Sequence, residues 1–140
     1  MAAIGGGCLP PDDPVKKPAA PDELIHTWTV GAHVMARTAS LTEVEAESFR
    51  GRTIAISASG YVSPWQGTCD EAGRTKRTRP LGDVVADEEL SSNATGLPAQ
   101  VTEYRLTCND RHNPLPLVMY VAGGRAVSCF NGVCYLMTAN

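Results

Sequence analysis

Apolar and polar side chains alternate most regularly in the C-terminal segment, residues 117–138, which reads LVMYVAGGRAVSCFNGVCYLMT. Alternation with a period of two is typical of β-strands. Two pairs of turn-forming residues interrupt the segment. Asn131-Gly132 suits a two-residue type I′ turn, because both central residues of that turn have a positive φ, and Gly123-Gly124 marks a second turn. The segment therefore predicts three antiparallel strands in a meander.

The same alternation recurs earlier in the chain. In LIHTWTV, residues 24–30, it places Trp28 on the face directed toward the core. A strand that begins at Tyr61 meets Pro64, and proline confines a strand to a sheet edge or a bulge. Further strands are expected over residues 53–58 and 101–108.

One helix is expected between the first two strands. Ser40-Leu41-Thr42-Glu43 matches a capping box, in which the serine hydroxyl accepts from the third helical amide while the glutamate reaches back. Gly51 supplies a stop, so the helix is predicted over residues 41–50. The expected fold is mainly β, an antiparallel meander of six to eight strands that closes into a small barrel or sandwich, with one short helix inserted after the first strand.

Residues 70–98 carry two charge clusters and little alternation. Basic residues fall within positions 74–79 and acidic residues within positions 83–89. We interpret this segment as a long loop or lid on which the two clusters pair with each other, rather than as a phosphate site. The clusters consist of Arg74, Lys76, Arg77 and Arg79, and of Asp83, Asp87, Glu88 and Glu89.

Five cysteines in 140 residues suit an exported domain. Cys129 and Cys134 face each other across the predicted turn as a pair whose Cα atoms lie roughly 4.5 Å apart, which a disulfide can span. Cys69 and Cys108 are the pair that remains once that bond is made, and both end or follow predicted strands.

Composition removes several classes of function. The net charge of −3 and the absence of a long basic face argue against nucleic acid as a partner, and no run of 18 apolar residues is present. Motifs for zinc hydrolases, phosphate loops, serine hydrolases and redox Cys-x-x-Cys pairs are absent. The three histidines lack metal-binding spacing, so neither a metal nor a cofactor is expected, and no catalytic residue is assigned.

Cys8 stands apart from the other cysteines. The preceding residues, Ile4-Gly5-Gly6-Gly7, resemble the lipobox at which bacterial signal peptides are cut and the cysteine is lipidated. Five of the fourteen residues from Leu9 to Asp22 are proline, which predicts a semi-rigid spacer. We therefore divide the chain into a signal remnant (1–8) that ends at Cys8, a tether (9–22) and a β domain (23–140).

Together, Cys8, the proline-rich tether, the early strand with Trp28 and the disulfide-bearing hairpin resemble the small envelope lipoproteins of Gram-negative bacteria with a lipocalin-like or similar β-barrel domain. The resemblance covers the layout of the chain. The lipocalin Gly-x-Trp pattern is not met, because His26 stands two residues before Trp28. Leu9 after the cysteine implies retention at the periplasmic face of the outer membrane, with the lipid as the anchor.

Three functions are expected. The leading one is a non-enzymatic envelope module that binds a small apolar ligand or an envelope component. Its candidate ligand-binding residues are Trp28, His26, Tyr104 and Trp65. The second is an inhibitor of an extracytoplasmic hydrolase, a lysozyme or a protease, that presents residues 109–114 or the arm at 74–79. The third is a thiol–disulfide redox protein that uses Cys129 and Cys134.

Overall fold

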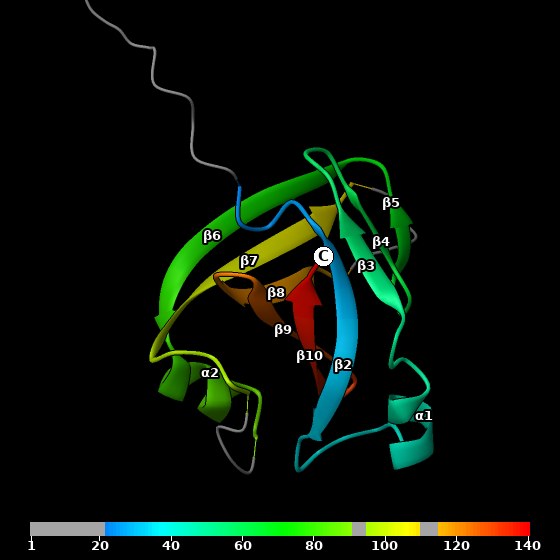
Figure 1. The fold of residues 1–140 in the computed structure, drawn as a ribbon, viewed down its shortest axis with the longest axis vertical. Helices are drawn as coiled ribbons and strands as arrows, with labels where there is room; N and C mark the ends of the chain where they lie inside the picture. Colours follow the sequence, from blue (N-terminus) through cyan, green and yellow to red (C-terminus); the bar gives the residue numbers. More distant parts are fainter. Residues whose placement is uncertain (1–21, 91–94, 110–114) are drawn as a thin grey trace, which may run out of the picture.

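The computed structural model describes residues 22–90, 95–109 and 115–140, which form one antiparallel sheet of nine strands curled into a nearly closed barrel (Figure 1). The order across the sheet is β5-β4-β3-β2-β10-β9-β8-β7-β6. The strands are β2 (Thr27–Met35), β3 (Thr53–Ile56), β4 (Tyr61–Ser63), β5 (Gly67–Cys69), β6 (Ala72–Pro80), β7 (Gln100–Cys108), β8 (Leu117–Ala122), β9 (Arg125–Phe130) and β10 (Val133–Ala139), and the helices are α1 (Glu43–Glu47) and α2 (Leu81–Asp87).

The predicted C-terminal meander is confirmed. It forms β8, β9 and β10, and its last turn has positive φ at both Asn131 and Gly132. Cys129 pairs with Cys134 in the register of β9 and β10. The predicted fold class is also confirmed, although nine strands are present in the described residues where six to eight were expected.

The barrel closes at a corner of the chain. β5 and β6 are the two end strands of the sheet, yet only Asp70 and Glu71 separate them in sequence. The disulfide between Cys69 of β5 and Cys108 of β7 ties the two ends together at this corner. A backbone hydrogen bond of 2.8 Å from the amide of Ala72 to the carbonyl of Ser59 adds a second link. We call this corner, with its disulfide, the seam.

The sheet is buried on both faces over β8, β9 and β10. Inward-facing side chains, among them Trp28, Met119 and Tyr135, fill the barrel and are fully buried. The outward-facing side chains of the same strands, such as Tyr120, lie in a second apolar cluster with Val84 of α2. Burial on both faces explains why β8 reads as a continuous apolar run, LVMYVA.

Two local predictions were wrong. α1 begins two residues later than expected, because Thr42 rather than Ser40 is the N-cap and forms the capping box with Glu45. Ser40 instead donates to the carbonyl of Asn131. Residues 70–98 are not a long loop or lid, since within the described part they form β6 and α2. Of the expected pairing between the two charge clusters, Arg79 with Asp87 is present.

Candidate functional site

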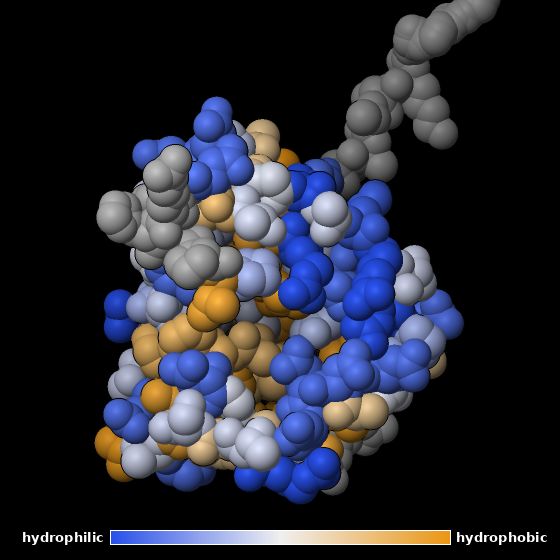
Figure 2. Space-filling view, turned by 180° about the vertical axis from the view of Figure 1, so that it is seen from behind, coloured by the Kyte–Doolittle hydropathy of each residue, from blue (hydrophilic) through white to orange (hydrophobic). Residues whose placement is uncertain are grey.

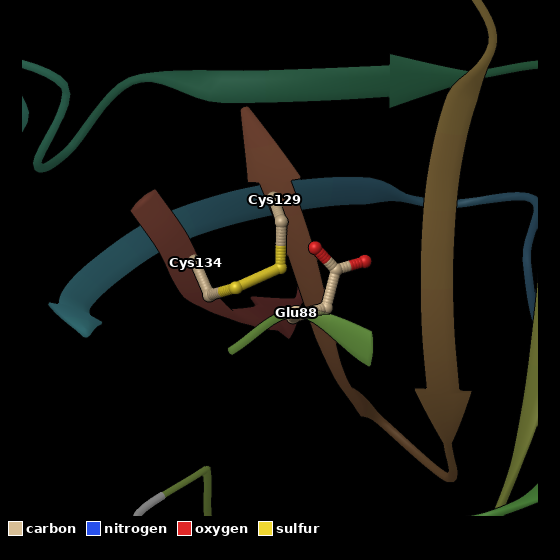
Figure 3. Close-up of side chains that lie close together, drawn as sticks. All are labelled: Glu88, Cys129 and Cys134. Carbon is tan, nitrogen blue, oxygen red and sulfur yellow. A yellow bond between two sulfur atoms is a disulfide. The ribbon is translucent and has the colours of Figure 1, made fainter. Parts of the chain in front are cut away.

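The predicted hairpin disulfide lies on the outer face of the sheet, beneath α2. The Cα atoms of Cys129 and Cys134 are 3.9 Å apart, and Cys134 is 1% exposed. The Glu88 carboxylate lies close to both sulfurs, with the three potential ligand atoms within 4.8 Å of one another (Figure 3). Both sulfurs are bonded to each other, so neither is available as a thiolate ligand in this oxidised state.

Glu88 is engaged by a second neighbour. The hydroxyl of Tyr120, which lies on the same outer face, donates a hydrogen bond to the Glu88 carboxylate. Burial is the main cause that raises the pKa of Tyr120 well above its ordinary value, and the hydrogen bond to Glu88 raises it further. Tyr120 therefore stays protonated and holds Glu88 against the sheet, as a link between α2 and β8.

The candidate ligand-binding residues belong to the packed interior or its rim. Trp28 is fully buried, its indole nitrogen donates to the carbonyl of Leu24, and the His26 ring meets it edge-on with 5.6 Å between ring centroids. Trp65 packs against the same core cluster as Trp28 and is stacked on Tyr135 with ring centroids 4.6 Å apart. These contacts are all with the protein's own side chains, and the role of the four candidates in binding stays a prediction.

Tyr104, the fourth candidate, connects the N-terminal residues to the barrel wall. Its hydroxyl donates to Glu23 over 2.7 Å, and the Arg74 guanidinium lies 5.2 Å from its ring centroid. Burial is the main cause that raises the pKa of Tyr104 above its usual range, and the hydrogen bond to the Glu23 carboxylate raises it further. Asp22 forms an ion pair with Arg74. These contacts hold residues 22–24 across one end of the barrel (Figure 1).

A buried carboxylate on the outer face was missed by the sequence analysis. Glu103 of β7 is 1% exposed and accepts hydrogen bonds from Arg79 at 2.7 Å and from Arg77 at 3.2 Å, while Arg105 lies 3.7 Å away. Burial raises the pKa of Glu103, but the two arginine hydrogen bonds outweigh burial and hold the pKa below its ordinary value. Arg79 bridges onward to Asp87 of α2.

A histidine clamped by two carboxylates forms a further polar cluster. His33 of β2 is 10% exposed, with Nε2 2.8 Å from Glu43 and Nδ1 3.3 Å from Glu47. The Nδ1 contact lacks hydrogen-bond geometry. The two glutamates are four residues apart on α1 and border an open pocket of about 570 Å³. The two glutamates contact different nitrogens of the His33 ring. This arrangement suits holding the imidazole in place. It does not suit a metal ion, which would need one ring nitrogen and both carboxylates on the same side.

Several sequence predictions fall on residues outside the described part of the chain. They are the lipidation of Cys8 and the boundaries of the tether, together with most of the loop 109–114 that was expected to face a hydrolase. Within the described residues, no helix has the length and apolar character needed to cross a membrane. Comparison of the chain with protein-family models, curated proteins and solved structures finds no match.

Proposed function

We propose that this protein is a non-enzymatic lipoprotein of the cell envelope that binds an envelope component through the outer surface of its barrel. The observation that carries the proposal is the packing of the barrel interior. Trp28, Met119 and Tyr135 are each 0% exposed and lie in one continuous cluster of buried side chains. A binding site for a small apolar molecule is a cavity of roughly 300 Å³ or more, and this space is occupied by the protein's own side chains.

Two disulfides support the extracytoplasmic part of the proposal. Bonds such as Cys69–Cys108 and Cys129–Cys134 persist in oxidising compartments and are rare in the cytosol. The lipobox-like sequence before Cys8 and the proline-rich spacer after it support an anchor that holds the barrel away from the bilayer.

The other two expected functions find less support in the packing. Cys134 is 1% exposed and Cys129 is partly buried, whereas redox thiols need access for a thiolate to attack. For an inhibitor, the filled core is favourable, but positions 74–79 form a strand instead of a protruding arm. Surface recognition of an envelope component therefore accounts best for a filled, braced barrel.

The test is intact-mass analysis of the full chain, purified in mild detergent from its native membrane fraction. We expect an acyl addition that maps to Cys8, the mass deficit of two disulfides, and no small molecule that is retained in stoichiometric amount. The same cells are then treated with a short-range crosslinker, and we expect adducts with an envelope component that disappear in the Cys8→Ser variant because the chain is no longer anchored. A chain that carries no acyl group, or one that retains an apolar small molecule, contradicts the proposal.

A further inference from the structure

β6 is an end strand of the sheet with an unusually long open edge. It spans nine residues and pairs along its whole length with β7. Among the described residues, no strand pairs with its other edge, since the strand order ends at β6. Open edges of this length are the places where proteins accept an additional strand from another chain.

The register identifies the backbone groups that point outward. Hydrogen bonds from Asn109 to the carbonyl of Glu71 and from Leu81 to that of Ala99 show that odd-numbered positions of this pair are joined to β7. In an antiparallel pair, the intervening residues turn their amide and carbonyl groups away from the partner. The amide of Ala72 confirms the direction, because it bonds to Ser59 outside the β6–β7 pair. The outward groups of the open edge therefore belong to Arg74, Lys76 and Thr78.

The edge has defined limits at both ends. At the start of β6 the amide of Ala72 is already occupied by Ser59, at the seam. At the end Pro80 has no amide hydrogen to donate. The open ladder between these limits fits an extended segment of about five residues, since an added strand bonds at every second position.

Charge decides what can occupy this edge. β6 carries four basic residues and no acidic one, in a chain whose net charge is −3. Arg74 already forms an ion pair with Asp22, and Arg79 forms ion pairs with Glu103 and Asp87, so Lys76 and Arg77 supply the positive charge for a partner. Lys76 is exposed, and the side chain of Arg77 is 63% exposed although it contacts Glu103. Hydrophilic side chains accordingly dominate the right-hand side of Figure 2, where β6 lies after the half turn from Figure 1. A second copy of β6 placed along this edge would set like charges against one another, which is destabilising.

We propose that the edge of β6 from Arg74 to Thr78 is a docking site for an extended acidic segment of a partner protein, which adds to the sheet as a further strand. The inference rests on the proposed function and specifies the chemistry of the component that is recognised. Backbone hydrogen bonds from the open edge provide the strand pairing, and Lys76 and Arg77 select acidic side chains on the two faces of the added strand.

Hydrogen exchange on the full chain tests the site directly. The probes are two capped eight-residue peptides, one that repeats Thr-Thr-Glu-Glu (the Thr-Glu peptide) and one that repeats Thr-Thr-Lys-Lys (the Thr-Lys peptide), so that charged side chains lie on both faces of the extended strand. We expect saturating Thr-Glu peptide to slow amide exchange of Arg74, Lys76 and Thr78 at least tenfold. The amide of Arg77, which points toward β7, serves as the internal reference and should change less than twofold. The Thr-Lys peptide should leave all four rates unchanged.

Two variants at one position separate the backbone contribution from the charge. Lys76→Ala keeps the outward amide and removes the charge, so we expect the dissociation constant of the Thr-Glu peptide to rise about threefold and to lose much of its salt dependence. Lys76→Pro removes the amide as well, without removing a bond to β7, and we expect a rise of at least tenfold. Unchanged far-UV circular dichroism and an unchanged melting temperature serve as the folding check for both variants.

Three outcomes would overturn this inference. They are equal binding of the two peptides, protection that appears elsewhere on the barrel, and peptide-free protection of the β6 amides that grows with protein concentration, which would identify a second copy as the occupant. None of them depends on the acyl group or on the crosslinked adducts. The failure of the β6 site is therefore distinguishable from failure of the proposed function, and the wild-type exchange measurement decides the matter even if Lys76→Pro does not fold.

Discussion

Glu103 is a carboxylate buried at a position where alternation alone predicts an exposed side chain. It is 1% exposed, and Arg79, whose side chain is 12% exposed, donates to it. Removal of the Glu103 charge takes the buried counter-charge from Arg79, which is poorly solvated and keeps the exposed Asp87 as its remaining carboxylate. We expect Glu103→Gln to lower the free energy of unfolding by about 3 kcal/mol at pH 7, measured by urea denaturation, since breaking a buried pair costs about 3–5 kcal/mol.

The matched control is Asp87→Asn, which touches the same arginine. The Asp87 side chain is 61% exposed, so the loss should be about 0.5 kcal/mol, as for other exposed ion pairs. Equal losses in the two variants would show that burial of Glu103 contributes nothing.

The same pair gives the protein a predicted acid sensitivity. Because arginine hydrogen bonds hold the pKa of Glu103 below its ordinary value of 4.5, the native state binds this proton less readily than the unfolded chain does. Its stabilisation is therefore present above that value and is lost as the pH falls through the native pKa. The stability difference between the wild type and Glu103→Gln should shrink correspondingly below pH 4.5.

Tyr135 presents the opposite case, a buried polar atom without a hydrogen bond. Its hydroxyl has no partner within the described structure, and burial raises the pKa of Tyr135 to about 12. An unsatisfied buried hydroxyl costs about 1–3 kcal/mol. We expect Tyr135→Phe to be neutral or to stabilise the protein by up to about 1 kcal/mol in thermal denaturation, because the ring stacking on Trp65 is kept.

Tyr120→Phe is the matched comparison, because it removes a hydroxyl that does have a partner, the Glu88 carboxylate. That variant should lose about 1–2 kcal/mol. A larger loss for Tyr135→Phe than for Tyr120→Phe would mean that the Tyr135 hydroxyl is bonded in solution.

At the residue scale, the sequence predicted what depends on near neighbours. The positive φ of Asn131 and Gly132 and the facing of Cys129 and Cys134 follow from turn geometry. The burial of Glu103 does not, because it depends on Arg77 and Arg79 on the adjacent strand. The register of β6 with β7 sets Arg77 opposite Glu103. If β6 had been recognised as a strand, this register would have predicted the ion pair that accompanies the burial of Glu103.

At the scale of elements, two glycines have contrasting environments. A Cβ added to Gly60, before β4, would lie 1.9 Å from the carbonyl oxygen of Cys69, whereas one added to Gly82 in α2 would meet nothing within 4 Å. We expect Gly60→Ala to destabilise the protein by about 2–3 kcal/mol, because the backbone at the seam must move. Gly82→Ala should stabilise it by up to about 1 kcal/mol through helix propensity. The melting temperatures of the two variants should therefore shift in opposite directions.

β6 shows why some of the strands could not be predicted from the sequence. Strands are recognised by alternation between a buried and an exposed face. Seven of the nine residues of β6 are exposed and the other two are only partly buried, so its sequence lacks that contrast. The start of α1 was misplaced for a different reason, because Ser40 and Thr42 are both competent caps and only tertiary contacts with Asn131 decide between them.

At the scale of the whole molecule, the two disulfides should differ in their contribution to stability. Cys69–Cys108 joins positions 39 apart in sequence and closes the seam, whereas Cys129–Cys134 joins positions 5 apart. Chain entropy gives about 4 kcal/mol for the longer loop and about 2 kcal/mol for the shorter one. We expect Cys69→Ser with Cys108→Ser to lower the free energy of unfolding about twice as much as Cys129→Ser with Cys134→Ser, by chemical denaturation of both double variants. An equal loss would show that the seam bond does not hold the barrel ends together.

The neighbouring positions of β2 and β10 in the sheet also govern when this fold can form. Met35 pairs with Val133 and Trp28 with Ala139, so the partners are about 100 residues apart in sequence. In a nascent chain, the edge of β2 that pairs with β10 has no partner until β10 has been synthesised. High contact order of this kind slows folding, so the barrel is expected to close only after the last strand has been synthesised.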